Sequence, residues 1–353
     1  MKRIYLDYTS LTPIDKRVMG EIKKYSKKDY SNPFALYSSA IKAKRAIEDA
    51  KNRIAKVIHA HPDEIIFTSG GTESNQLVLR NSKKIIISVI EHSSIRKTEK
   101  DITIIPVGKN GIVDLDILKK SINSETTLVS IIMVNNEIGT IEPIHEIAKI
   151  VRNYRKANNS AYPLFHTDAC QAFIHSHVYV EKLGVDMLSL DGHKIYGPRG
   201  VGMLYIKRGS MEIDRPGTEN LPGIMGFALA IEIAEKMRKK ETDRIADLRS
   251  FFLNELKKIN PEIRVNGNIE NSSPHILNVS IPNIDNEFFV LQLDTNGIEC
   301  STKSACLKDE DESYVLKAID ADSHNSVRFS FGRDTKKVDL MRVLGIIKKI
   351  LIK

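Results

Sequence analysis

Short apolar runs alternate with amphipathic stretches along most of this chain, and this alternation limits the folds open to it more than any other feature. Two stretches, 40–58 and 143–157, carry apolar residues at helical spacing. Runs of strand length cover 64–68, 85–90, 102–107, 127–134, 164–168, 185–190 and 202–206. Strands that alternate with helices in this way form a mostly parallel sheet with helices on both faces.

The chain is long enough for two domains. At 353 residues it exceeds the size at which a single hydrophobic core stops growing. A helical stretch over 221–258 leads to a second region, 263–353, where strands near 276–281 and 327–331 alternate with helices. The last expected helix carries apolar residues on one face, namely Val338, Met341, Leu344, Ile347 and Leu351.

Composition excludes several classes of protein. Hydrophobic residues make up 41% and charged residues 28% of the chain, as in ordinary globular proteins. The apolar runs are too short to span a membrane, and the N-terminus lacks the apolar stretch of a signal peptide. Three cysteines suit neither a disulfide framework nor a metal cluster, so we expect no metal and a cytoplasmic location. The net charge of +8 comes from lysines spread along the chain, so direct nucleic-acid binding is not expected.

A lysine lies in a tight loop directly after the run 185–190. The loop reads Asp191-Gly192-His193-Lys194 and continues into Ile195-Tyr196-Gly197-Pro198, where glycine and proline break regular structure. A lysine held beside a histidine in such a turn can lose its proton and form a Schiff base. The run 164–168 ends in Asp168, and an aspartate and a lysine at successive strand ends suit the two ends of a pyridoxal ring. The pattern indicates pyridoxal 5'-phosphate (PLP) as the cofactor.

Further polar groups stand where strands are expected to end. Gly71 and Thr72, in Ser69-Gly70-Gly71-Thr72, precede a helix and could cradle a phosphate. His92, Asn136 and Gln171 each come shortly after another apolar run. Taken singly, each has an ordinary reading as a turn, loop or helix-cap residue. Because α/β sheets place ligands at the carboxyl ends of strands, their occurrence together indicates one site.

These motifs together resemble the cysteine desulfurases of the NifS/IscS type, which are class V aminotransferases with the fold-type I PLP architecture. The resemblance covers nearly the full chain, and the order and spacing of the motifs make it specific. The motifs are Tyr5-Leu6-Asp7-Tyr8, Ser31-Asn32-Pro33, Phe67-Thr68-Ser69-Gly70-Gly71-Thr72-Glu73-Ser74-Asn75, Glu91-His92, Val134-Asn135-Asn136-Glu137-Ile138-Gly139, His166-Thr167-Asp168-Ala169-Cys170-Gln171, Gly192-His193-Lys194, Arg215-Pro216-Gly217-Thr218, Ser304-Ala305-Cys306 and Arg328-Phe329-Ser330-Phe331-Gly332-Arg333.

The resemblance implies an α/β fold with two domains. A mostly parallel seven-stranded sheet would lie in a large PLP-binding domain over 13–250. A smaller α+β domain would combine 1–12 with 251–353 and carry a mobile cysteine loop at about 300–326.

The resemblance also implies roles for the residues around the pyridoxal ring. Lys194 would form the Schiff base with PLP, Asp168 would pair with the ring nitrogen, and His92 would stack on the ring and take part in catalysis. Asn136 and Gln171 would contact the side of the ring that carries the phenolic oxygen.

The same resemblance assigns the phosphate end to four residues. Gly71, Thr72 and His193 would bind the phosphate from within one subunit. Thr218 would reach the phosphate of the neighbouring subunit, which implies a homodimer with shared active sites.

Sulfur chemistry is assigned to Cys306 by the resemblance. L-cysteine would be converted to L-alanine while its sulfur forms a persulfide on Cys306, and Arg328 with Asn136 would bind the substrate. The persulfide would supply a sulfur-acceptor protein, either an iron–sulfur scaffold or a tRNA-thiolation enzyme. Two alternatives stay open: a related PLP lyase or aminotransferase for another small amino acid such as selenocysteine, and a weakly active PLP-binding interaction protein of a sulfur-transfer complex.

The chain departs from the family pattern close to the cofactor. Asp191 stands where these enzymes usually have a serine that donates to the phosphate. A carboxylate there should repel a phosphate, so we expect weaker cofactor binding or an Asp191 side chain that turns away. A glycine-rich segment before Arg215-Pro216-Gly217-Thr218 is also missing, and Tyr37 replaces a usual histidine.

Overall fold

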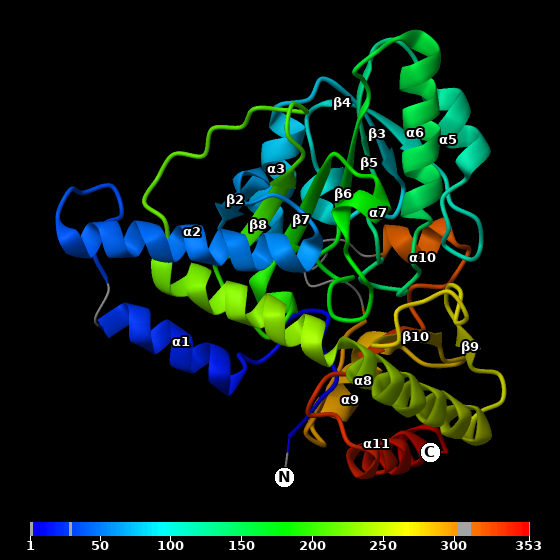
Figure 1. The fold of residues 1–353 in the computed structure, drawn as a ribbon. Helices are drawn as coiled ribbons and strands as arrows, with labels where there is room; N and C mark the ends of the chain where they lie inside the picture. Colours follow the sequence, from blue (N-terminus) through cyan, green and yellow to red (C-terminus); the bar gives the residue numbers. More distant parts are fainter. Residues whose placement is uncertain (1–2, 28–29, 303–311, 353) are drawn as a thin grey trace.

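A seven-stranded sheet forms the centre of the larger part of the molecule (Figure 1). The computed structural model describes residues 3–27, 30–302 and 312–352. In spatial order the strands of the large sheet are β2 (Ile65–Thr68), β8 (Gly202–Ile206), β7 (Met187–Asp191), β6 (Leu164–Asp168), β5 (Thr126–Ser130), β3 (Lys84–Ser88) and β4 (Asp101–Ile105). The apolar runs of the sequence therefore form the expected strands, and the predicted α/β fold class is confirmed.

Strand direction decides where a site can form. Strands β7, β6, β5, β3 and β4 pair in parallel, whereas β8 runs antiparallel to both β7 and β2. Every strand except β8 therefore points the same way. Because the loops that follow parallel strands emerge at one edge, the polar groups after these strands converge there.

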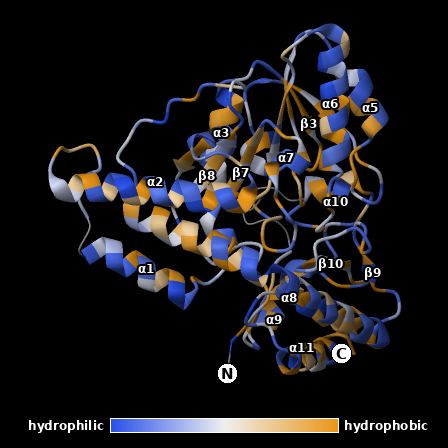
Figure 2. Cartoon of the chain, in the orientation of Figure 1, coloured by the Kyte–Doolittle hydropathy of each residue, from blue (hydrophilic) through white to orange (hydrophobic). Residues whose placement is uncertain are grey.

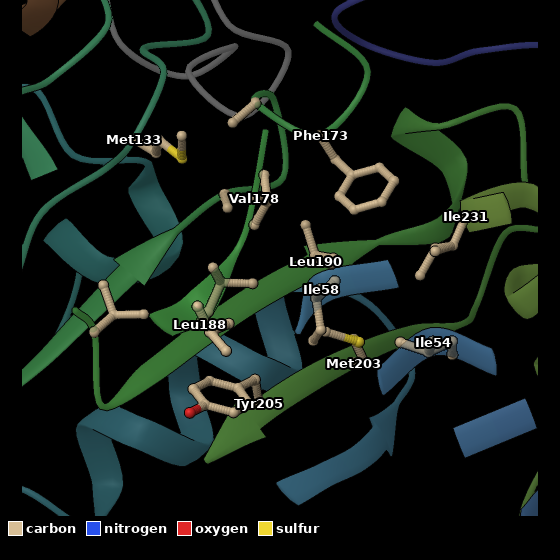
Figure 3. Close-up of a cluster of buried hydrophobic side chains, with 14 of the residues drawn as sticks. Ile54, Ile58, Met133, Phe173, Val178, Leu188, Leu190, Met203, Tyr205 and Ile231 are labelled. Carbon is tan, nitrogen blue, oxygen red and sulfur yellow. The ribbon is translucent and has the colours of Figure 1, made fainter. Parts of the chain in front are cut away.

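Alternate side chains of the strands pack into two cores on opposite faces of the large sheet. On one face, Leu188 and Leu190 of β7 join Met203 and Tyr205 of β8, as Figure 3 shows. On the other face, Met187 packs with residues of the neighbouring strands and of α3 (Gly71–Arg80). This alternation follows from the two-residue repeat of a strand.

Helices cover both faces of the large sheet. The first core receives α2 (Ser38–Ile58) and α6 (Ile144–Asn158), and the second receives α3 and α4 (Ser93–Arg96). Short helices and turns complete this part, namely α1 (Lys16–Lys27), η1 (Pro62–Glu64), α5 (Leu115–Ser121), α7 (Val180–Leu183) and η2 (Gly192–Lys194). The helices expected over 40–58 and 143–157 are thus present.

One helix of 39 residues, α8 (Leu221–Ile259), joins the two parts of the molecule (Figure 1). Its first half packs into the core of the large sheet, and its second half packs into a separate core. The elements of the smaller part are β1 (Ile4–Tyr5), β9 (Arg264–Val265), β10 (Ile276–Ser280), α9 (Asn286–Asp294), β11 (Ile298–Glu299), α10 (Tyr314–Ala318), β12 (Ser326–Ser330) and α11 (Lys337–Leu351). A three-stranded antiparallel sheet, β12-β10-β9, and a two-stranded parallel pair, β1-β11, form its strands. The exact domain boundary at residue 250 stays a prediction.

The buried face of α11 differs from the face expected from sequence. Val338 and Met341 are 66% and 58% exposed, whereas Leu340, Val343 and Ile347 are buried. Each step of three residues falls about 60° short of a full turn, because one turn of an α-helix takes 3.6 residues. Side chains spaced three apart therefore move gradually around the helix. A stripe that begins at Val338 therefore starts on the exposed side and reaches the buried face only at Leu344 and Ile347.

None of the helices within the described residues combines the length and the apolar character needed to cross a lipid bilayer.

The second core depends on a cluster of three aromatic rings. Phe252 on α8 packs edge-on against Phe329 and Phe331, at ring-centroid distances of 5.1 and 5.7 Å. Phe252 is fully buried, and Phe329 directly follows Arg328 on β12. The aromatic cluster thus fixes the strand that presents Arg328.

We expect Phe252→Ala to lower the free energy of unfolding by about 3–5 kcal/mol, because it removes a buried ring and leaves a cavity. Urea unfolding measures this change. Phe288→Ala is the matched control: Phe288 is 61% exposed on α9, and its loss should change stability by no more than about 0.5 kcal/mol. Equal effects of the two substitutions would contradict this account of the core.

Candidate active site

A cavity of about 210 Å³ lies at the carboxyl edge of the large sheet. Its lining brings together residues from the loops after β2, β3, β5, β6 and β7 with one residue of β12. The lining residues that the sequence had indicated are Gly71, Thr72, His92, Asn136, Asp168, Gln171, His193, Lys194 and Arg328. These predicted residues, up to 257 positions apart in the chain (328 minus 71), thus face one cavity.

Two predicted site residues, Thr218 and Cys306, are not among the described residues that line the cavity. Thr218 is exposed in the loop before α8 and does not line the cavity of its own chain. Arg215, in the same loop, donates from Nε to Glu73 Oε1 at 3.1 Å, which ties this loop to the first turn of α3. Cys306 lies outside the described residues.

The amine of Lys194 is fixed by two backbone carbonyls. Lys194 follows β7 in the short turn η2, and its Nζ donates to the oxygens of Thr9 and Ser10 at 2.7 and 2.9 Å. Thr12 holds the same turn from the other side, since its hydroxyl donates to the carbonyl of His193 at 2.8 Å. The segment after β1 therefore closes over the lysine.

The carboxylate of Asp168 is oriented on both oxygens. Its Oδ2 accepts from Asn75 Nδ2 at 2.7 Å, and its Oδ1 accepts from the backbone amide of Cys170 at 3.0 Å. Asn75 Nδ2 also donates to Ser94 Oγ at 2.9 Å, and that hydroxyl lies 2.8 Å from Nδ1 of His92. One asparagine thus connects the aspartate to the histidine.

Sequence reasoning missed Asn75 as a site residue. It lies one helical turn after Gly71, so it was visible within the motif, but the motif does not reveal which face of α3 meets β6.

Gln171 shares a carbonyl with the lysine. Its Nε2 donates to the oxygen of Thr9 at 2.9 Å, the same atom that accepts from Lys194. On the other side, Gln171 Oε1 lies 3.3 Å from Nε2 of His275, so that nitrogen carries the proton. Burial lowers the pKa of His275 to about 3, which keeps the ring neutral. His275, which sequence reasoning also missed, sets the orientation of the Gln171 amide.

The guanidinium of Arg328 is almost fully buried at the opposite wall of the cavity. Its Nη2 donates to Asp7 Oδ1 at 2.8 Å and to Ser10 Oγ at 3.1 Å, and its Nη1 donates to the carbonyl of Asn136 at 2.9 Å. Asp7 compensates its charge. The Nε atom has no hydrogen-bond partner among the described residues.

A buried glutamate, Glu91, precedes His92 in the chain. Glu91 Oε1 accepts from the hydroxyl of Ser88 at 2.5 Å and from the amide of Ile132 at 2.9 Å, which joins the ends of β3 and β5. Burial raises the pKa of Glu91 to about 8. The side chain is therefore largely a neutral acid at pH 7, and it acts as a structural bridge between the two strand ends.

The glycine-rich turn before α3 is packed against two side chains. A Cβ on Gly71 would lie 2.5 Å from Cys170 Sγ, and a Cβ on Gly70 would lie 2.8 Å from Asp191 Oδ2. Gly70 also has a φ of +151°, which side chains disfavour. Both positions therefore require glycine.

The side chain of Asp191 points toward the glycine-rich turn at the start of α3. Its carboxylate accepts from the backbone amides of Gly71 and His193 at 2.8 and 3.0 Å. His193, expected to contact a phosphate, has its Nδ1 2.5 Å from Asp191 Oδ1. The alternative expectation, that the Asp191 side chain points elsewhere, is wrong because these amide donors attract the carboxylate.

Comparisons with known proteins agree with the fold. The sequence profile of the family described as Aminotransferase class-V matches residues 4–214 and 213–343. The cysteine desulfurase IscS of Dictyoglomus turgidum is 41% identical, over 100% of this chain and 96% of the relative. The cysteine desulfurase IscS 1 of Archaeoglobus fulgidus is 36% identical, over 98% and 96% of the two chains.

Solved structures give the same result. A NifS-like protein superposes with a TM-score of 0.91 at 31% identity, over 99% of this chain and 100% of the other. A NifS-like protein from Rickettsia africae superposes with a TM-score of 0.88 at 29% identity, over 100% of both chains. Since both the profile and the relatives span nearly the whole length, the chain belongs to the class V aminotransferase family and, within it, to the cysteine desulfurases of the NifS/IscS type.

Proposed function

We propose that this cysteine desulfurase uses PLP to convert L-cysteine to L-alanine and passes the sulfur first to Cys306. The observation that carries the proposal is the shared cavity of Lys194 and Asp168, in which both side chains are held by hydrogen bonds at defined positions. A protein with cysteine bound is among the similar structures, with a TM-score of 0.78 at 29% identity, over 94% of this chain and 99% of the other.

The residues present suit PLP chemically. An amine that can reach an aldehyde, a carboxylate fixed on both oxygens, and the start of helix α3 face one cavity. When bound, PLP would supply an electron-accepting ring for bond changes at Cα and Cβ of the substrate.

The lysine and the aspartate would handle protons. Lys194 would hold the cofactor aldehyde at rest and, once released, would move the proton of the substrate Cα. Asp168 would hold a proton at the ring nitrogen, and Asn75 keeps its carboxylate in place for that role. His92 would lie against the ring, oriented through Ser94.

Substrate recognition would fall to Arg328 and Asn136. A guanidinium presents its donors in a planar fork that matches a carboxylate. Arg328 contacts Asp7 and Ser10 on the segment that also fixes Lys194. Substrate carboxylate and reacting amine would therefore be positioned by the same stretch of backbone.

Cys306 would carry the sulfur. Its thiolate would form an S–S bond with the substrate sulfur as the Cβ–S bond breaks, and the electron pair left on carbon would take up a proton to give alanine. Burial raises the pKa of both other thiols, Cys170 and Cys300, so neither suits a thiolate nucleophile near neutral pH. An iron–sulfur scaffold or a tRNA-thiolation enzyme would then accept the sulfur.

The names of the relatives favour desulfuration over the two alternatives, the lyase or aminotransferase for another amino acid and the weakly active interaction protein. A cytoplasmic location stays a prediction from the cysteine content.

We infer that the active form is a homodimer. Phe34, Leu36 and Tyr37, at the start of α2 and on the loop before it, are 71%, 94% and 56% exposed. Figure 2 shows hydrophobic colour on the loop before α2. Phe34 and Leu36 line a surface groove together with Glu219, which follows the exposed Thr218 in the chain. A second copy of the chain that covers this surface would bury the apolar groups. Thr218 would then lie beside the part of the second copy's cavity that is assigned to the PLP phosphate.

We expect Leu36→Asp to shift the protein from dimer to monomer, because a carboxylate would be buried in the interface without a partner. Light scattering after size-exclusion chromatography measures the mass. Phe288→Asp is the matched control, since it places the same charge on an exposed aromatic of α9. A dimer that survives Leu36→Asp at micromolar concentration would contradict the proposed interface.

We expect Lys194→Ala to abolish the visible absorption of lysine-bound PLP and to lower alanine and sulfide formation by at least about a hundredfold, because it removes the proton-transfer group. Absorption spectra and product assays with L-cysteine and a thiol measure both effects. Lys207→Ala, which changes an exposed lysine directly after β8, should leave both unchanged. Full turnover by Lys194→Ala would refute the assignment of the lysine.

We expect Cys306→Ala to keep the PLP absorption and to lose sulfide formation from L-cysteine, because the sulfur then has no acceptor thiol. Cys300→Ala should keep both properties. Full turnover of L-cysteine by Cys306→Ala would instead favour the lyase or aminotransferase alternative.

A further inference from the structure

An internal carboxylate occupies the anion-binding position at the start of α3. Asp191 Oδ2 accepts from the amide of Gly71, the first residue of that helix, at 2.8 Å. The free amides at a helix N-terminus carry partial positive charge and bind anions, phosphates in particular. This position lines the cavity that also holds Lys194 and Asp168. One of the amides at this helix start therefore already has an anionic partner from the same chain.

The carboxylate is held firmly. Asp191 is 6% exposed, its Oδ1 accepts from the amide of His193 at 3.0 Å, and Nδ1 of the same histidine lies 2.5 Å away. Burial by itself raises the pKa of Asp191, but the hydrogen bond and charge of His193 and the amide of Gly71 outweigh burial, so the pKa lies below its ordinary value. The side chain is thus an anion near neutral pH.

The charged and titratable groups around Asp191 come from several elements. His193 and Lys194 follow it in η2, the thiol of Cys170 comes from the segment after β6, and α3 contributes the amide of Gly71. The neighbouring strand β8 places Gly202 opposite it and adds no charge. Lys194 donates to the carbonyls of Thr9 and Ser10, so His193 is the titratable side chain in direct contact with the Asp191 carboxylate.

We propose that Asp191 competes with the phosphate group of PLP for the Gly71 amide and makes cofactor binding proton-dependent. This inference rests on the proposed use of PLP. A phosphate dianion and a carboxylate in one cradle repel each other strongly at low dielectric. Binding then takes up one proton, which lies between the Asp191 carboxyl oxygen and a phosphate oxygen as a hydrogen bond. The aspartate becomes a donor to the phosphate in place of a repelling anion.

Titration of the full-length, cofactor-free protein with PLP and with pyridoxal tests the inference, because pyridoxal lacks only the phosphate. Visible absorption reports binding of both. We expect Asp191→Ser and Asp191→Asn to bind PLP at least about tenfold more tightly than the parent protein at pH 8, with unchanged affinity for pyridoxal. Asn is nearly isosteric with Asp and serves as the second variant where Ser perturbs folding, which circular dichroism checks.

The pH dependence provides a second readout. Relative to pyridoxal, the affinity of the parent protein for PLP should fall as pH rises from about 6.5 to 8.5, by up to about tenfold per unit for one proton. In the two variants this relative dependence should be lost. Both readouts measure binding and need no turnover.

The outcomes separate the two claims. Parent and variants that all bind PLP with equal affinity, or variants that bind it more weakly, would overturn the inference and leave PLP use intact. An equal change for PLP and pyridoxal would also overturn it, because the effect would not lie at the phosphate. No visible absorption with PLP in any of the three proteins would overturn the proposed use of PLP itself.

Discussion

One short segment after β1, residues 7–12, ties both parts of the molecule to the cavity. The carbonyl of Thr9 accepts from Lys194 and Gln171 of the large part, while the side chains of Asp7 and Ser10 accept from Arg328 of the smaller part. Because a buried donor that loses its acceptor costs free energy, these hydrogen bonds hold the segment against both parts. The position of the segment therefore sets the distance between the amine and the guanidinium.

The site is assembled at strand ends because the sheet directs them to one edge. β6 ends at Asp168 and β7 at Asp191, and both acids line the cavity. The two acids meet different surroundings. Asn75 and a backbone amide orient Asp168, whereas Asp191 meets the helix start and His193. Equal side chains thus acquire different roles from their neighbours alone.

Local patterns predicted most of the architecture. The expected ranges 164–168 and 202–206 coincide with β6 and β8, and α8 extends one residue beyond the expected 221–258. These elements depend on side-chain periodicity, which a sequence displays directly. The face of α11 was misjudged because a three-residue spacing does not define one helix face over four turns. The partners Asn75 and His275 were missed because their contacts join elements distant in sequence.

The sequence by itself determined which elements form and which chemical groups follow each strand, because these properties depend on neighbouring residues. Only the tertiary structure decided what those groups contact. It placed the carboxylate of Asp191 on the amide of Gly71, 120 positions away (191 minus 71), where electrostatic repulsion of a phosphate had suggested a side chain turned aside. Attraction to a buried amide and to His193 depends on atoms that meet only after the chain has folded.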